Sequence, residues 1–547
     1  MSGARTHSYY SAPSEKPLVY ETIGACLERI AAQFPDREAL VVRHQGVRWT
    51  YTEYLREVNR LAGGLLALGI GKGDRVGIWA PNCAEWCLTQ FATARIGAIL
   101  VCINPAYRIF ELEFALNKAG CVALVTAQQY RSSDYAGMLA DLTAAGKLPH
   151  LKHPIAIGDV APPGMRRFGD VCAMGEDKAN EIAAIGATLS PDDDINIQFT
   201  SGTTGTPKGA TLSHFNILNN GRIVGEGMRF TEKDRLCIPV PLYHCFGMVM
   251  GNLACISHGA TAVFPNDGYD ALKTLEAIAD ERCTALHGVP TMFIAELEHP
   301  DFAKFDLSSL RTGIMSGAPC PVEVMRRVLA DMHMTEVLIA YGQTEASPVN
   351  HMTTRDDPVD KRVNTVGRPG PHLEIKMIDE DGAVVPVNTP GEICCRGYSV
   401  MQGYWDEPAR TAETVDDAGW LHSGDLGTMD ADGYVRIVGR LKDMIIRGGE
   451  NIYPREIEEF LFTHPAVQEV QVFGVPDRKF GEQVCAWIRL RPGHSVTEDD
   501  VQAFCRAHIA HFKVPRHVRF VDEIPMTVTG KPQKFRMREV MMREMEG

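Results

Sequence analysis

The sequence lacks three features that would point to particular classes of protein. No apolar run approaches the roughly 18 residues that a membrane-spanning helix needs. No Cys-x-x-Cys pair occurs among the 15 cysteines, and we therefore expect no structural zinc. The third missing feature is an excess of positive charge, because 69 acidic residues outnumber 55 basic ones. The formal net charge of −14 disfavours nucleic-acid binding, because a phosphate backbone attracts clustered positive charge.

The first residues lack the apolar stretch of a secretory signal, and their few charges make a weak case for a transit peptide. Scattered thiols without a pairing pattern are typical of a reducing compartment. We therefore expect a cytoplasmic protein. A chain of 547 residues is too long for one hydrophobic core, so at least two domains are expected.

Residues 200–209 read TSGTTGTPKG and follow a short strand-like alternation. Glycines let backbone N–H groups approach a ligand closely, hydroxyls donate hydrogen bonds to oxyanions, and Lys208 adds a mobile positive charge. The order of residues differs from a Walker loop, which needs G-x-x-x-x-G-K-[ST]. We interpret the stretch as a cradle for a polyphosphate. Its composition alone is also compatible with an ordinary Ser/Thr/Gly surface loop.

Helix-like and strand-like patterns alternate along the first part of the chain, with helices expected at 85–96 and 109–119 and strands between them. This alternation predicts an α/β fold with doubly wound, mixed or parallel sheets. Thr52 is placed to cap one helix and Ser213 another. Between about 128 and 190 the pattern weakens, and we expect peripheral structure and a loop without an assigned function.

Glycine-punctuated short strands follow residue 366 and predict a β-rich subdomain. A charged turn at 439–443 lies between two apolar strands, and the residues after it are enough to bury a core of their own. We therefore expect a large N-terminal domain, 1–440, that includes the β-rich subdomain. A small α+β domain, 441–547, is expected to follow it.

The loop at 200–209 resembles the phosphate loop of the adenylate-forming enzymes, the AMP-binding superfamily. This superfamily includes acyl-CoA synthetases, aryl-CoA ligases, luciferases and peptide-synthetase adenylation domains. Four further motifs follow in the family's order: GIMSGAP, YGQTE, SGD and PMTVTGK. The likeness is strongest to medium-chain-type fatty acyl-CoA synthetases and covers nearly the whole chain.

The resemblance implies a role for each matching residue. ATP or AMP would be bound by Thr200, Ser201, Gly202, Thr203, Thr204, Gly205, Lys208, Gly317, Ala318, Pro319, Tyr341, Gly342, Asp425 and Arg440. Thr344 would meet the α-phosphate, and Glu345 would hold Mg²⁺. Lys531 would bridge the acid's carboxylate and the α-phosphate, which makes Lys531, Thr344 and Glu345 the catalytic set.

Two further regions take their roles from the resemblance. Lys442 would be the hinge of a mobile C-terminal domain, and Gly448, Gly449, Glu450 and Asn451 would line the passage for CoA. His244, at the mouth of the acid pocket, Phe246, Gly247, His287 and Gly288 would form the acyl pocket. A lone histidine in such a segment is also commonly a packed residue.

The acid pocket segment carries one informative absence. Adenylation domains for α-amino acids use an acidic residue here to hold the ammonium group, and residues 241–247 contain no carboxylate. A neutral or apolar acid tail is therefore favoured. The sequence does not distinguish aliphatic from aryl acids, nor does it set the chain length.

The resemblance implies an ATP-dependent acyl-CoA synthetase that forms an acyl-adenylate and then a thioester. Mg²⁺ is the expected cofactor, ATP and CoA are the co-substrates, and the partners are these small molecules, with a homodimer left open. The alternatives are an aryl-acid CoA ligase, an adenylation module that loads a carrier protein, and a nucleotide sensor without turnover. No carrier-like domain follows, and the intact motif residues count against a sensor.

Overall fold

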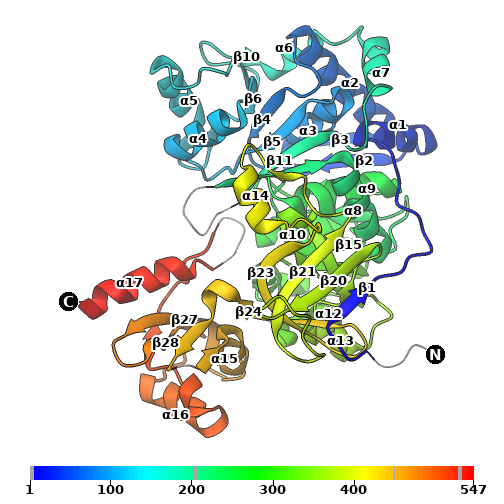
Figure 1. Ribbon diagram of the computed structural model, residues 1–547. Coiled ribbons are helices and arrows are strands. Elements are labelled where there is room, and N and C mark those ends of the chain that lie inside the picture. The colour runs from blue at the N-terminus through cyan, green and yellow to red at the C-terminus, as the bar shows by residue number, and fades with distance from the viewer. Residues whose placement is uncertain (1–4, 201–206, 319, 449, 528–531, 547) are drawn as a thin grey trace. The chain divides into compact units, whose positions relative to one another are not determined.

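The computed structural model describes residues 5–200, 207–318, 320–448, 450–527 and 532–546 (Figure 1). The chain divides into two compact units. The larger unit comprises Ser11–Glu374 and Cys395–Leu421, and the smaller unit comprises Met1–Tyr10, Ile375–Cys394 and His422–Gly547. The expected boundary at residues 440 and 441 concerns a movement between domains, and it stays a prediction.

An eight-stranded sheet forms the first part of the larger unit, and its strands from β10 to β11 are parallel. The strands, in spatial order, are β10 (Arg166–Arg167), β9 (His153–Ala156), β6 (Ala123–Thr126), β4 (Arg75–Trp79), β5 (Ile99–Cys102), β11 (Asp194–Thr200), β12 (Lys208–Ser213) and β22 (Gly403–Tyr404). The last two strands are antiparallel to their neighbours.

Both faces of this sheet are buried. Along β5, Leu100 and Cys102 belong to one hydrophobic cluster, whereas Ile99 and Val101 belong to another. Successive side chains of a strand point to opposite faces, so the two clusters lie on opposite sides of the sheet. Figure 1 shows α4 and α5 beside β4 and β6, and their apolar residues join the second cluster. The doubly wound arrangement predicted from the sequence is confirmed.

A nine-stranded sheet forms the other part of the larger unit. In spatial order its strands are β19 (Arg368–Pro369), β18 (Val349–Met352), β17 (Glu336–Gly342), β16 (Thr312–Met315), β15 (Ala285–Gly288), β13 (Arg235–Cys237), β14 (Thr261–Phe264), β2 (Glu38–Val42) and β3 (Val47–Thr50). The central strands from β17 to β2 are parallel, and the outer pairs are antiparallel. Mixed sheets were predicted, and they are confirmed.

The helices of the larger unit connect and cover these strands. They are α1 (Ile23–Gln33), α2 (Tyr51–Ala67), α3 (Ala84–Ile96), α4 (Ile109–Ala119), α5 (Tyr135–Ala144), α6 (Phe168–Ala173), α7 (Ala179–Gly186), α8 (His214–Gly227), α9 (Ala254–His258), α10 (Ala271–Asp280), α11 (Pro290–Leu297), α12 (Val322–Asp331), α13 (Val359–Asn364) and α14 (Pro408–Thr414). A hairpin of β7 (Gln129–Tyr130) and β8 (Ser133–Asp134) precedes α5.

Two helix caps test the sequence analysis. Ser213 caps α8 as predicted, with its side chain accepting from the Asn216 N–H. The predicted cap at Thr52 is wrong. Thr50 caps α2, because Glu53 lies three residues later and completes a reciprocal capping box, whereas the Thr52 hydroxyl donates to the carbonyl of Pro35.

A five-stranded sheet carries most of the β-rich segment, and most of its residues belong to the smaller unit. Its order is β1 (Tyr9–Ser11), β20 (Leu373–Ile378), β21 (Gly391–Gly397), β23 (Leu421–Met429) and β24 (Val435–Arg440). The short strands expected after residue 366 are therefore present. Strands β23 and β24 pair antiparallel.

The C-terminal residues form an α+β body with its own core, as expected. Its strands are β26 (Glu450–Ile452), β25 (Ile445–Arg447), β28 (Gly481–Leu490), β27 (Val467–Asp477) and β29 (His517–Phe520), and its helices are α15 (Pro454–Leu461), α16 (Glu498–His508) and α17 (Lys534–Glu546). Pro454 occupies the first turn of α15, where its missing N–H has no partner to lose. Ile457, Val472 and Ile488 are among the buried residues of the core.

Candidate active site

Two paired strands flank the stretch that is predicted to bind phosphate. Thr200 ends β11 and Lys208 begins β12, and the two residues are cross-strand partners in the antiparallel ladder. The ladder therefore holds the two ends of the loop side by side. The predicted residues Ser201, Gly202, Thr203, Thr204 and Gly205 lie outside the described residues.

Lys208 and Glu345 are brought together by a tyrosine that the sequence analysis missed. The ammonium of Lys208 lies 4.7 Å from the ring centroid of Tyr404, which is a cation–π distance. The hydroxyl of Tyr404 donates to Oε1 of Glu345 at 2.8 Å. Burial, followed by the charge of Glu345, raises the pKa of Tyr404, so this hydroxyl stays protonated and remains a donor. The ring of Tyr404 thus contacts the cation of Lys208, and its hydroxyl contacts the carboxylate of Glu345.

The YGQTE motif occupies the end of β17 and the turn that follows. A Cβ on Gly342 would lie 1.8 Å from the carbonyl oxygen of Pro348, so only glycine fits there. Thr344 and Glu345 then form a short 3-10 helix, η4 (Thr344–Ala346), in which Thr344 is buried. The Met401 N–H donates to the Glu345 carbonyl at 2.9 Å and fixes this turn.

Tyr341, the residue expected to stack on adenine, contacts a buried histidine. Its ring centroid lies 5.7 Å from that of His351, its cross-strand partner in β18. Burial lowers the pKa of His351 to about 3, so its imidazole is neutral. The wall residue Gly317 has a positive φ of 88°, and the Ala318 carbonyl accepts a hydrogen bond from the thiol of Cys320. Pro319 lies outside the described residues.

The predicted acyl-pocket residues meet at a π-helix, η2 (Phe246–Leu253). Gly247 has no room for a side chain, because a Cβ would lie 2.5 Å from the Pro241 carbonyl oxygen. The ring of Phe246 lies 5.1 Å from that of His287 in β15. The π-helix is rare in proteins and is frequently found at functional sites.

His287 is buried and neutral. Its Nε2 lies 3.0 Å from the Met250 carbonyl oxygen, which makes Nε2 the protonated nitrogen. Burial lowers its pKa to about 4. Gly288 follows it, and a Cβ there would lie 2.9 Å from the Phe293 ring. His244 is half-buried, and its Nδ1 accepts a hydrogen bond from the Phe246 N–H at 3.2 Å.

The smaller unit brings Asp425 and Arg440 together. They are cross-strand partners in β23 and β24, and Nε of Arg440 donates to Oδ1 of Asp425 at 2.9 Å. The Asp425 side chain is 10% exposed and the Arg440 side chain 60%, so the pair presents its guanidinium outward. The preceding Gly424 has a φ of 70°, which turns the chain sharply before Asp425.

The predicted hinge and CoA residues lie on turns of the smaller unit. Lys442 belongs to the exposed 3-10 helix η5 (Leu441–Asp443). Glu450 and Asn451 begin β26, opposite Arg447 and Ile446 of β25, and Gly448 has a φ of 61° at the tip of this hairpin. Gly449 and Lys531 lie outside the described residues. A bridge between Met526 and Pro532 closes the base of the loop that carries Lys531.

Among the described residues, none of the helices is both long and apolar enough to cross a bilayer. Tyr404 is the site residue that the sequence analysis missed. It lies 59 residues from Glu345, and no local pattern links the two.

Comparisons with known proteins agree with this arrangement. The chain is 49% identical over 536 residues to YngI of Bacillus subtilis (strain 168), whose name assigns it provisionally to the acyl-CoA synthetases, with 95% of this chain and 97% of that protein covered. It is 45% identical over 556 residues to the human medium-chain acyl-CoA ligase ACSF2, mitochondrial, with 98% of this chain and 90% of the relative covered.

A solved structure and two family matches extend the comparison. The anthranilate CoA ligase AuaEII, solved in complex with anthranoyl-AMP, is 28% identical and superposes with a TM-score of 0.85, with 97% of this chain and 99% of that chain covered. Residues 27–405 match the family described as AMP-binding enzyme, and residues 456–531 match the AMP-binding enzyme C-terminal domain. The chain therefore belongs to the AMP-binding enzyme family.

Proposed function

We propose that this AMP-forming acid–CoA ligase activates a medium-chain fatty acid, with ATP and CoA as co-substrates. The medium chain length is supported by the similarity to the medium-chain acyl-CoA ligase ACSF2, which covers 98% of this chain at 45% identity. The carboxylate would attack the α-phosphorus of ATP and release pyrophosphate. The CoA thiol would then attack the acyl-adenylate and release AMP.

The first half-reaction joins two anions, so its main demand is electrostatic. Lys208 and the loop beside it would hold the phosphates, and Thr344 would donate to the α-phosphate. Lys531 would lie between carboxylate and phosphate as they approach. Donors fixed in advance act where charge develops and need no reorganisation during the reaction. The strand ladder at Lys208 and the buried turn at Thr344 support such prior positioning.

Glu345 offers a chemically suitable ligand for Mg²⁺. A carboxylate is a hard oxygen ligand, and Mg²⁺ in nucleotide sites usually takes one or two carboxylates together with substrate phosphates. The hydroxyl of Tyr404 donates to Oε1 of Glu345 at 2.8 Å. A bound Mg²⁺ would offset the charge of the phosphates, and Tyr404 would keep the carboxylate in place.

Separate groups of residues would hold the nucleotide's base and its ribose. Tyr341 would stack on adenine beside Gly317, Ala318 and Gly342. Asp425 would accept hydrogen bonds from the ribose hydroxyls, with Arg440 as the neighbouring cation. The antiparallel pairing of β23 with β24 supports the last pair, because it sets the carboxylate and the guanidinium side by side.

The acid's tail would lie against neutral side chains. Residues 243–250 and 285–290 contain no acidic or basic residue other than histidine, and His287 is neutral by burial. Phe246 and Gly247 are buried beside it. A site of this kind offers no counter-charge to an amino or second carboxyl group. A buried polar group without a partner costs about 1–3 kcal/mol, and a buried charge costs more.

The second half-reaction would use another orientation of the C-terminal domain, 441–547. Lys531 and residues 448–451 are about 80 residues apart on one small body. In a single orientation of that body, we expect only one of them to contact the α-phosphate. We therefore assign Lys442 to the pivot, and Gly448, Gly449, Glu450 and Asn451 to the CoA passage. The exposure of Lys442 and the turn structure around it support a hinge there.

A rate survey tests the substrate. Pyrophosphate release and acyl-CoA formation would be measured separately over straight-chain acids from short to long, with an amino acid and a dicarboxylate included. The expected result is a maximum at medium chain length. A preference for the amino acid or the dicarboxylate would overturn the proposal. Adding CoA separates a ligase from a carrier-loading module, because only the ligase forms a thioester with free CoA.

An aryl acid is the second candidate, and one observation favours it: the superposition with an anthranilate CoA ligase at a TM-score of 0.85. An apolar pocket cannot strongly reject a ring of similar bulk. Benzoate and anthranilate therefore belong in the same survey. A kcat/KM for either above that of the best aliphatic acid would replace the fatty acid by an aryl acid.

A further inference from the structure

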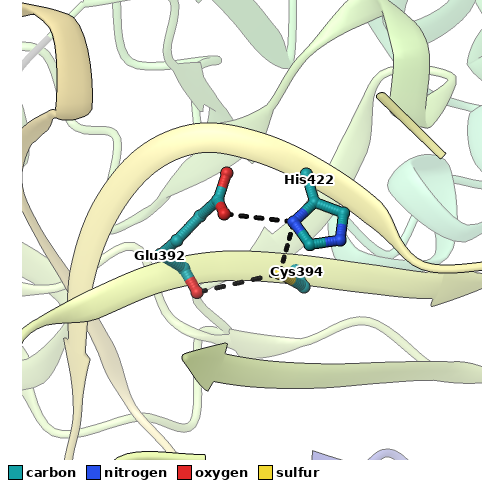
Figure 2. A group of neighbouring side chains, drawn as sticks. All are labelled: Glu392, Cys394 and His422. Atoms are coloured by element: carbon teal, nitrogen blue, oxygen red, sulfur yellow. Dashed lines mark hydrogen bonds and ion pairs between the residues drawn. The ribbon is translucent and has the colours of Figure 1, made fainter. Parts of the chain in front are cut away.

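Three potential metal ligands of different chemistry meet in the smaller unit, away from Glu345 in the sequence and in a separate unit. Glu392 and Cys394 lie two residues apart on β21, so their side chains share one face of the strand. His422 lies on the neighbouring strand β23. Figure 2 shows the carboxylate of Glu392 and the thiol of Cys394 converging on the same ring nitrogen of His422.

Two of the three distances among these atoms match the distances between ligands of one metal ion. Nδ1 of His422 lies 3.1 Å from Oε2 of Glu392 and 3.6 Å from Sγ of Cys394. One ligand atom from each residue lies within 4.8 Å of the others. A tetrahedral Zn²⁺, with bonds of about 2.3 Å to sulfur and about 2.0–2.1 Å to nitrogen and oxygen, separates its ligand atoms by roughly 3.3–3.6 Å.

We propose that Glu392, Cys394 and His422 bind a zinc-like divalent cation, with a fourth position open to water. On binding, the Cys394 thiol loses its proton and its thiolate becomes a ligand, while His422 binds as neutral imidazole through Nδ1. The charges then balance, because one carboxylate and one thiolate offset a divalent cation. The site contains no Cys-x-x-Cys pair. Its ligands are a Glu-x-Cys pair on one strand and a histidine 28 residues later in the sequence.

Neighbouring groups support the ligand geometry. The Gly424 N–H donates to Oε1 of Glu392 at 3.0 Å, which leaves Oε2 directed at His422. Such outer hydrogen bonds orient metal ligands and are often as important as the ligands themselves. Cys394 is fully buried, whereas the side chains of Glu392 and His422 are 18% and 29% exposed. An ion can therefore reach the site from the carboxylate and imidazole side.

The ligand types select the class of cation. Thiolate and imidazole favour zinc and similar borderline ions, whereas Mg²⁺ prefers six oxygen ligands. This site should therefore not bind the Mg²⁺ that accompanies ATP. An ion here would tie β21 to β23, the strand that continues through Gly424 to Asp425. Its direct effect would be on the stability of this sheet.

The experiment uses the full-length protein freed of metal by a chelator and then titrated with Zn²⁺, with Mg²⁺ in a parallel titration. The expected result is one equivalent of Zn²⁺ retained after gel filtration, a Tm that rises with Zn²⁺ but not with Mg²⁺, and a thiolate-to-metal absorption band when Co²⁺ replaces Zn²⁺. A ligand that binds only the folded state must raise the Tm in this way.

Two variants and two controls locate the site. Cys394→Ser and His422→Gln should each weaken Zn²⁺ binding at least about 10–100-fold, the loss that even a change in the outer shell causes. His422 is partly exposed, so its variant keeps the test valid if Cys394→Ser fails to fold. Cys395→Ser changes the next residue of the strand, and Cys320→Ser removes the one cysteine that is not fully buried; both should bind as the wild type does. Absence of a bound equivalent in the wild type, or a Co²⁺ band that persists in both ligand variants, would overturn the proposal.

Discussion

The two units bury polar groups in different ways. In the larger unit His214, His287 and His351 are fully buried and neutral, with pKa values lowered to about 3, about 4 and about 3 by burial. In the smaller unit every histidine is at least partly exposed. One core cluster of its C-terminal part is almost wholly aliphatic, and a second contains Phe473, Trp487 and Met537. The larger unit thus buries three imidazoles completely, and the smaller unit, in its described part, buries none.

The candidate site residues follow the same difference. Those of the larger unit lie at strand ends and in buried turns, where the sheet fixes them before any ligand arrives. In the smaller unit Lys442 lies on an exposed 3-10 helix and Gly448 at a hairpin tip, whereas Asp425 and Arg440 pair across two strands. The comparison predicts that changes in the larger unit weaken positioning or stability, whereas changes in the smaller unit separate the two half-reactions.

Lys531→Ala should give the largest effect. The lysine's charge would join carboxylate and α-phosphate, and the loss of one such preorganised contact typically slows a reaction by about 10²–10³-fold. The loss should fall on adenylation, measured as acid-dependent pyrophosphate release. Thioester formation from chemically supplied acyl-adenylate should largely survive, because the two anions are then already joined. Equal losses in both half-reactions would contradict the role assigned to Lys531.

Lys442→Pro should slow the second half-reaction and leave the first nearly unchanged, the opposite of Lys531→Ala. Proline fixes φ near −65° and removes a backbone donor, so a residue that must visit two conformations is held in one. Pyrophosphate release in a single turnover should stay near normal. Acyl-CoA formation should slow by about 10²-fold, a loss that a misplaced reacting group can cause. Stopped-flow measurement of each step decides the matter, with Lys442→Ala as the matched control that keeps the backbone free. A variant that slows both steps alike, or one that unfolds, would argue against the hinge.

These two residues also show what a sequence can predict. Their motifs are contiguous, so the resemblance supplies residue and role together. The parallel strands between residues 75 and 126 were predicted for a related reason, because each strand is a short apolar run and each helix has a local pattern. In contrast, α5 was missed between residues 128 and 190: its buried stripe is only Tyr135, Leu139 and Leu142 among alanines, which is weak against the surrounding polar residues.

Features that depend on distant contacts could not be predicted. The π-helix at Phe246–Leu253 requires Gly247 to pack against the Pro241 carbonyl, which no periodicity reveals. The contact of Tyr404 with Glu345 depends on the fold that brings β22 next to β12. A neutral state for His287 likewise follows from burial and not from its neighbours in sequence. The residues of the candidate site could be named from the sequence, whereas their contacts in the fold could not.

The buried histidine makes the larger unit sensitive to acid. His287 has a pKa of about 4 in the folded state, against an ordinary 6.5. Below pH 6.5 the unfolded chain takes up a proton at His287 that the folded chain does not. The full stability of the folded protein is therefore present above pH 6.5, and part of it is lost as the pH falls toward 4. At pH 5 the loss is about 2 kcal/mol.

The measurement compares unfolding free energies at pH 7 and pH 5 for the wild type and His287→Gln. The wild type should lose about 2 kcal/mol more than the variant over this interval. His494→Gln, at an exposed position of the smaller unit, is the control and should lose as much as the wild type. Identical pH dependence in wild type and His287→Gln would contradict a neutral buried imidazole.

Tyr404→Phe should give the smallest effect, and it tests whether the larger unit positions its charged groups in advance. The change removes the hydroxyl that donates to Glu345 and keeps the ring beside Lys208. A hydrogen bond to a charged group contributes about 1.5–3 kcal/mol, and water can replace part of it. Adenylation should therefore slow by about tenfold, with a higher Mg²⁺ concentration needed for half-maximal rate, and CoA transfer should be unaffected. Tyr398→Phe is the matched control, because its hydroxyl accepts from Asn220 and does not contact Glu345. If Tyr404→Phe matched that control in both half-reactions, the tyrosine would be a packing residue, and Glu345 would be positioned by its turn alone.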